Sequence, residues 1–134
     1  MEASLKEKFE SYPDEVKQSL MRLRGLILDV AKEDDLGPVE ESLKWGELSY
    51  CAKGGSAIRI GWRPETPDKC FVFFHCQTTL IETFKEIYGD LFSYEGNRAI
   101  VLDRSKLELG QELKHCLGLA LQYHKLKHLP LLGA

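Results

Sequence analysis

Apolar residues recur at helical spacing in two long segments, one near each end of the chain. The first segment follows Pro13, and its apolar positions are Val16, Leu20, Leu23, Ile27 and Val30. The second segment precedes Pro130, and its apolar positions are Leu113, Leu117, Ala120 and Leu121. Intervals of three and four place each set on one face, so the pattern predicts two amphipathic helices. A shorter helix with capping-box spacing at Ser4 and Glu7 is expected before Pro13.

Between these helices the apolar pattern changes to the two-residue period of strands. In the segment AIRIGW the isoleucines and Trp62 share one face, whereas Arg59 points to the other. Residues 70–76, CFVFFHC, are apolar on both faces, which is typical of a central strand covered on both sides. Turn pairs at Gly54-Gly55 and Gly96-Asn97 predict two hairpins.

These elements predict a single α+β domain spanning residues 1–134, in the order α-α-β-β-β-α-β-β-α. A helix with capping-box spacing at Thr79 and Glu82 separates three strands from the last two. The segment EESLKWG, residues 40–46, is expected to form a single helical turn before the first strand. We therefore expect one antiparallel sheet of about five strands, and the chain length matches one domain of ordinary size.

The charge balance argues against two classes of partner. A net charge of −3 does not favour binding to a nucleic-acid backbone or an anionic membrane surface, both of which need clustered Lys and Arg. Residues 1–11 are rich in charge, and no run of about 18 apolar residues occurs, so neither a signal peptide nor a spanning helix is predicted. We expect a cytoplasmic protein with no nucleic-acid or membrane partner.

Cysteine chemistry is not favoured by the spacing of the cysteines. Cys51, Cys70, Cys76 and Cys116 stand in apolar surroundings, and we interpret them as reduced core thiols. Residues six apart on a strand are about 20 Å apart, and His75 points to the face opposite Cys76. These side chains therefore cannot close one tetrahedral metal site while the segment remains a strand.

A set of polar and aromatic residues on and beside the strands is the more interesting candidate site. Its members are Lys44, Trp45, Tyr50, Arg59, His75, Gln77, Asn97 and Arg98. If they converge on one side of the sheet, guanidinium groups and aromatic walls would suit a small anionic ligand such as a carboxylate or a phosphate. The alternative is structural: Trp45 anchors the sheet edge, Arg59 pairs with a carboxylate and Asn97 makes a turn.

The sequence contains no catalytic signature. It lacks the G-x-S-x-G elbow, the Walker loop and the G-x-G-x-x-G fingerprint. The leading hypothesis is therefore a non-enzymatic module without a cofactor, which binds a small anionic ligand or a partner protein. A homodimer formed through a sheet edge or the apolar tail at residues 129–132 is a further possibility.

Three stretches resemble one known family. FESYPDEVKQSLMRLRGLI followed by EESLKWGELSY is similar to the opening of the YdhG-like domains of unknown function. The stretch CQTTLIETFKEIYGDLFSYEGNRAIVL resembles a proteobacterial-type branch of that family. The resemblance implies an antiparallel sheet with helices at both ends of the chain. Leu48 stands where the family usually has proline, so the local turn is expected to differ there.

The resemblance also implies an alternative function, because some members of the family are labelled frataxin-like intracellular iron chaperones. An acidic run could supply the oxygen ligands that hard cations prefer, and its candidate iron ligands are Asp34, Asp35, Glu40 and Glu41. The plainer interpretation of the same run is a solvated helix end and loop.

Overall fold

The computed structural model describes residues 1–107 and 109–134. Its strands are β1 (Val39–Lys44), β2 (Glu47–Ala52), β3 (Ile58–Gly61), β4 (Lys69–Phe74), β5 (Ser93–Glu95) and β6 (Ala99–Asp103). Within the described residues these six strands form one sheet in the order β1-β2-β3-β4-β6-β5. Every neighbouring pair is antiparallel. The expected α+β class is therefore confirmed.

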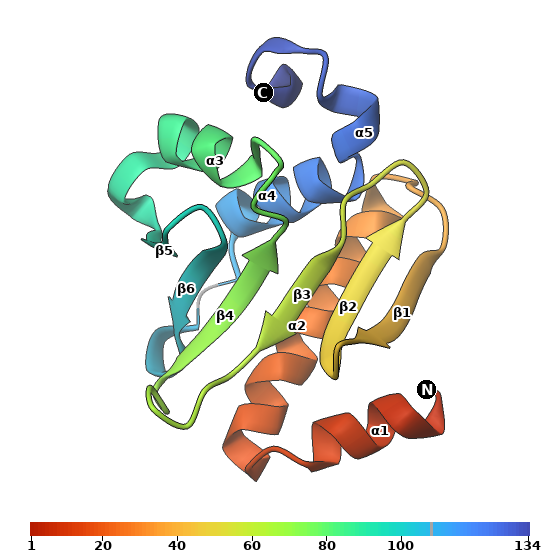
Figure 1. Cartoon of the computed structure of the whole chain (residues 1–134), viewed down its shortest axis with the longest axis vertical. Coiled ribbons are helices and arrows are strands. Elements are labelled where there is room, and N and C mark those ends of the chain that lie inside the picture. The colour runs from red at the N-terminus through yellow and green to blue at the C-terminus, as the bar shows by residue number, and fades with distance from the viewer. Residues whose placement is uncertain (108) are drawn as a thin grey trace.

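Helices lie along one face of the sheet and at its ends. They are α1 (Ala3–Glu10), α2 (Asp14–Glu33), α3 (Leu80–Tyr88), α4 (Gln111–Leu121) and α5 (Tyr123–Leu126), with 3-10 turns η1 (Gly89–Leu91), η2 (Arg104–Lys106) and η3 (Pro130–Gly133). Figure 1 shows α2 and α4 packed together behind the sheet, whereas the near face carries none of the described helices. We call this near side the open face. None of the described helices is long and apolar enough to cross a membrane.

The core lies between the sheet and the two long helices. The strands contribute side chains without exposed surface, among them Leu48, Tyr50, Ile58, Ile60, Val72 and Ile100. They meet the apolar stripe of α2, where Leu20, Leu23 and Ile27 are also fully buried. Burial of each such aliphatic side chain stabilises the fold by about 1.5–3 kcal/mol. The predicted stripe of α2 is confirmed.

The first strand was not predicted. Residues 39–44 pair along their whole length with β2, so the expected helical turn at EESLKWG is wrong, and the described part of the chain has six strands where about five were expected. The reversal is made by Trp45 and Gly46, whose φ angles are +55° and +77°. Two successive positive φ angles are what a tight hairpin turn requires. A tryptophan rarely adopts this conformation, which is why the turn did not stand out in the sequence.

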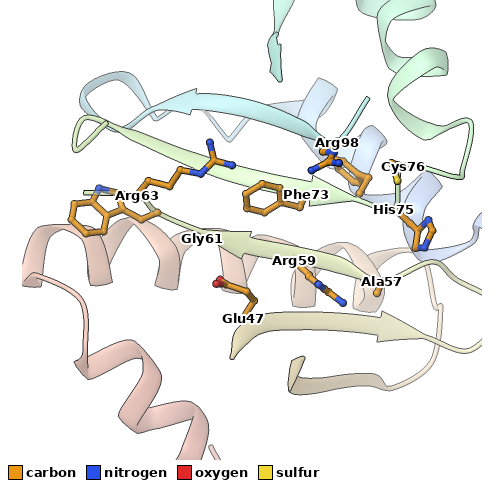
Figure 2. A pocket seen from close by; sticks show the side chains of 11 residues that line it. Glu47, Ala57, Arg59, Gly61, Arg63, Phe73, His75, Cys76 and Arg98 are labelled. Atoms are coloured by element: carbon orange, nitrogen blue, oxygen red, sulfur yellow. The ribbon is translucent and has the colours of Figure 1, made fainter. Parts of the chain in front are cut away.

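Among the described residues, helices cover the central strand β4 on one face only. Phe73 points to the open face (Figure 2), and Phe71, two residues earlier on the same strand, shares that face. Their rings stack with centroids 5.6 Å apart. Phe71 is 4% exposed because the guanidinium of Arg63 lies 4.4 Å from its ring centroid. The expectation of a strand covered on both sides is therefore wrong, because an arginine rather than a helix covers the second apolar row.

Both expected capping boxes are wrong in detail. The first helix begins at Ala3, and the Ser4 hydroxyl donates to the carboxylate of Glu2 at 2.8 Å instead of capping a backbone N–H. Thr79 does precede α3, but its side chain makes no capping hydrogen bond. At the start of α3 the Leu80 N–H donates instead to the Thr78 hydroxyl at 3.4 Å, since spacing alone does not fix which oxygen meets a free N–H.

The β2–β3 turn is attached to the end of α4. The Ser56 N–H donates to the Ala120 carbonyl at 2.9 Å, and the His124 N–H donates to the Gly54 carbonyl at 2.9 Å. A Cβ atom at Gly55 would lie 2.4 Å from the Leu121 carbonyl oxygen, so only glycine permits this approach. These contacts hold the turn that precedes β3 against the helix layer.

Candidate functional site

A groove of about 490 Å³ lies on the open face over β2, β3 and β4 (Figure 2). Its lining includes Glu47, Arg59, Gly61, Phe73, His75 and Arg98. The two-residue period of the strands sends the side chains of Glu47, Arg59 and Phe73 away from the helices, and the register places Arg59 beside Phe73 and Gly61 beside Phe71. Arg98 enters from the turn before β6 rather than by strand alternation, because the cross-strand partner of Phe73 is the next residue, Ala99. The groove is therefore mainly a product of sheet alternation on a face that carries none of the described helices.

Two arginines flank the ring of Phe73. Arg59 is its cross-strand partner on β3, and Ala99 is its partner on β6, immediately after Arg98. The Arg98 carbonyl also accepts a hydrogen bond of 2.7 Å from the N–H of Phe74. The backbones of the two arginines are thus about two strand spacings, or about 10 Å, apart. In the part of the chain that the structure describes, neither guanidinium has a carboxylate oxygen within 4.0 Å.

The third arginine of the groove is already paired. Arg63 donates to both carboxylate oxygens of Glu95, at 2.8 and 3.0 Å. These hydrogen bonds lower the pKa of Glu95 and raise that of Arg63. The same guanidinium lies over the rings of Phe71 and Phe73, at 4.4 and 5.7 Å from their centroids. Arg63 therefore acts as a wall of the groove, and its charge is balanced by Glu95.

The ends of the groove differ in chemistry. Glu47 lies at one end near Trp62, whose ring meets Tyr12 edge-on with centroids 6.4 Å apart. Burial, and then the charge of Glu47, raise the pKa of Tyr12 to about 12. At the other end the Nδ1 of His75 accepts a hydrogen bond of 3.0 Å from the N–H of Gln77. This bond assigns Nδ1 as the acceptor, so the neutral ring carries its proton on Nε2 as a donor.

Three of the eight residues in the predicted site line this groove, namely Arg59, His75 and Arg98. Tyr50 lies on the opposite, helix-facing side with no exposed surface, because it stands one residue out of phase with the open-face positions. Gln77 is exposed and contributes its backbone N–H to His75.

The other predicted residues lie at the hairpin turns. Trp45 is 94% exposed at the β1–β2 turn, so it does not anchor the sheet edge, and Lys44 is exposed beside it. Asn97 occupies the β5–β6 turn, where its side-chain oxygen accepts a hydrogen bond of 3.4 Å from Lys85. Asn97 thus has the structural turn role that the sequence left open, and these residues stand apart from the groove lining.

Several groove residues were missed in the sequence. Counting in steps of two from Arg59 gives Gly61, and counting back from His75 gives Phe73, so the strand period alone could have found both. Trp62 was expected beside the isoleucines, but β3 ends at Gly61 and the tryptophan lines the groove. Glu47 reaches the groove through the β1–β2 hairpin, which the sequence did not reveal.

The cysteines are free, and only two of them are core residues. Cys70 and Cys116 are buried, and burial raises their pKa values to about 11 and about 12. Cys51 is half-buried, and Cys76 is exposed at the edge of the groove. The interpretation of all four as core thiols is therefore wrong for Cys51 and Cys76, because one side of Cys51 and the end of β4 face solvent.

The acidic run does not gather into one cluster. The carboxylate of Glu41 faces the helices, where it accepts hydrogen bonds from both Nε and Nη2 of Arg24 and from the hydroxyl of Tyr50. Neighbouring Glu40 is exposed on the other side of β1 by strand alternation, and Asp34 follows the last residue of α2. In the described residues no group of three or more His, Cys, Asp or Glu side chains is placed to hold a metal ion.

Comparison with known proteins gives no relative: no family model, no curated protein and no solved structure matches this chain. The YdhG-like resemblance of the sequence therefore stays a prediction.

Proposed function

We propose that this chain is a non-enzymatic module that binds a small anion, a carboxylate or phosphate carried by a flat apolar group, in the open-face groove. The observation that carries this proposal is the pair Arg59 and Arg98, which flank Phe73 without a carboxylate partner in the described residues. A guanidinium offers a planar fork of donors that matches carboxylate and phosphate oxygens. The half-buried ring of Phe73 supplies an apolar surface between the two forks.

The size of the groove fits a small molecule rather than a polymer. Its volume of about 490 Å³ lies in the range of ligand sites. A nucleic-acid backbone needs an extended basic surface, whereas the net charge here is −3 and the positive charge is local. The free cysteines, two of them reachable by solvent, agree with a reducing compartment such as the cytoplasm.

The iron-chaperone alternative has less support from the geometry. Iron held by carboxylates requires several oxygen ligands around one point. Glu41 is engaged with Arg24 and Tyr50, and Glu40 lies on the opposite side of the sheet. These two carboxylates therefore do not converge on one point, as an iron site would require.

Calorimetry and thermal unfolding with three anionic probes test the proposal. The probes are phenylacetate, benzyl phosphate and inorganic phosphate, and neutral phenylacetamide serves as the uncharged control. The two aromatic anions should bind and raise the unfolding temperature, because a ligand that binds only the folded state stabilises it. Arg59→Ala and Arg98→Ala should each weaken binding about tenfold or more, since a hydrogen bond to a charged group contributes about 1.5–3 kcal/mol.

Matched variants separate the groove from general charge effects. Lys44→Ala removes an exposed cation at the β1–β2 turn, outside the groove, and should leave affinity unchanged. Arg59→Lys keeps the charge but loses the fork, so it should bind less tightly than the wild-type protein. The proposal fails if no anion binds, or if Lys44→Ala weakens binding as much as the two arginine variants.

A further inference from the structure

Resting on the proposed function, we infer that the ligand of the groove is a zwitterion of the amino-acid or short-peptide class. Its acid group meets Arg59 and Arg98, and its ammonium group meets Glu47. The inference comes from the carboxylate at the other end of a groove whose remaining charge is positive. Glu47 would then select amine-bearing ligands from among anions in general.

The carboxylate of Glu47 is available to a ligand. The residue opens β2, and its side chain is half-buried on the open face. Among the described residues no Lys, Arg or His nitrogen lies within 4.0 Å of it, even though Lys44 is its cross-strand partner. A carboxylate in this position, facing a groove that contains arginines, is complementary to an added cationic group.

The separation of the charged groups leaves room for a molecule between them. Leu48 pairs with Ile60, so Glu47 lies beside Gly61, two positions along β3 from Arg59. Two residues along a strand correspond to about 7 Å. Figure 2 shows the side chain of Arg59 extending away from Glu47, so these two residues do not neutralise each other directly.

Gly61 keeps the space between these charges open. A Cβ atom there would lie 3.4 Å from the Glu47 Oε2 and 3.5 Å from the Cε2 atom of Phe73. Any side chain longer than alanine would therefore occupy the position between the carboxylate and the ring. With glycine, the apolar part of a zwitterion can lie on Phe73 while its ammonium group reaches Glu47 and its acid group reaches the arginines beside the ring.

Ligands that differ by one charged group test this inference by calorimetry. The first set is phenylalanine, 3-phenylpropionate, which lacks the amine, and phenethylamine, which lacks the acid. The second set is glycyl-phenylalanine and its N-acetyl form, which distinguish a short peptide from a free amino acid. In at least one set the zwitterion should bind about tenfold more tightly than the analogue without its ammonium group, and phenethylamine should bind most weakly.

Two variants assign that preference to Glu47. Glu47→Gln should abolish the preference for the zwitterion while leaving 3-phenylpropionate bound at least as tightly as before. Glu40→Gln removes an exposed carboxylate outside the groove, so it should keep the preference. The unfolding temperature of each variant shows that it is folded.

The possible failures are distinguishable. If neither the acids nor the zwitterions bind, the proposed function fails and this inference fails with it. If 3-phenylpropionate binds as tightly as phenylalanine, and N-acetyl-glycyl-phenylalanine as tightly as its free form, anion binding stands and the zwitterion inference is overturned. The inference is also overturned if Glu47→Gln weakens the binding of the zwitterions and of their amine-free analogues equally.

Discussion

The hydrogen-bonded group Arg24–Glu41–Tyr50 supports a specific prediction for the substitution Tyr50→Phe. The Tyr50 hydroxyl donates to the Glu41 Oε2 at 2.7 Å, and Arg24 donates to the same carboxylate. Tyr50 has no exposed surface, and the side chains of Arg24 and Glu41 are 23% and 14% exposed. The substitution therefore removes one donor from a shielded carboxylate and keeps the packing of the ring.

The expected loss is moderate because Glu41 retains its other partner. A hydrogen bond to a charged group contributes about 1.5–3 kcal/mol to stability. Because Arg24 still donates to Glu41 in the variant, we expect a loss at the lower end of this range. With a urea m-value of about 1.5–2 kcal/mol/M, a loss of about 1.5 kcal/mol lowers the unfolding midpoint by about 0.8–1 M.

The effect should depend on pH with a defined sign. Burial alone raises the pKa of Glu41, but the hydrogen bonds from Arg24 and Tyr50 and the charge of Arg24 outweigh it, so the pKa lies below its usual value. A carboxyl group with a lowered pKa stabilises the fold above its unfolded pKa of about 4.3. That stability is lost as the pH falls through the lower, folded pKa. The loss of unfolding free energy caused by Tyr50→Phe should therefore have its full size at pH 7 and become smaller below about pH 4.

Urea unfolding followed by circular dichroism measures this difference, and Tyr94→Phe is the matched control. The Tyr94 hydroxyl is buried without a hydrogen-bond partner among the described residues, so its removal should leave the midpoint unchanged or raise it. The reasoning is refuted if both variants lower the midpoint equally, or if the effect of Tyr50→Phe stays constant from pH 7 to pH 3.

Two further predictions concern the glycines and the thiols. Gly55→Ala should lower the free energy of unfolding by about 2 kcal/mol or more, because its Cβ would meet the Leu121 carbonyl oxygen at 2.4 Å. Gly25→Ala should raise the free energy of unfolding by about 0.5–1 kcal/mol, because Gly25 lies in the middle of α2 and a Cβ there meets no described atom within 4 Å. Chemical unfolding of both variants shows whether the two changes have opposite signs. In native protein treated with iodoacetamide, mass spectrometry should find Cys76 alkylated well before Cys116, whose pKa burial raises to about 12, and equal rates would contradict this.

The sequence predicts those parts of the fold in which apolar residues repeat with a helical or strand period. The stripe of α2 and the alternation around Arg59 were read correctly, because each residue type there matches a repeating burial requirement. The hairpin at Trp45-Gly46 was missed because its first residue adopts a positive φ that tryptophan rarely takes. Without that hairpin, Glu47 could not be recognised as a neighbour of Gly61.

The predictable part of the site is smaller for a related reason. Residue type suggested Arg59, His75 and Arg98, and all three line the groove. Residue type also suggested Tyr50, but the alternation of β2 places its side chain in the core. Whether an arginine remains without an acidic partner depends on the register of distant strands and on loop paths. Arg63 and Glu95 are hydrogen-bonded although they are 32 residues apart, so local sequence does not identify which arginines have an acidic partner.

The two phenylalanines of β4 explain why the groove differs from an ordinary exposed sheet surface. Exposed aromatic surface in the middle of a sheet is unfavourable, and Arg63 removes most of it at Phe71 by stacking on the ring while Glu95 holds the guanidinium in place. Phe73 keeps its outward surface, and the arginines beside it lack an acidic partner among the described residues. A partly exposed ring or an arginine without an acidic partner is common by itself. Side by side, they form a surface that a flat anion complements in both shape and charge.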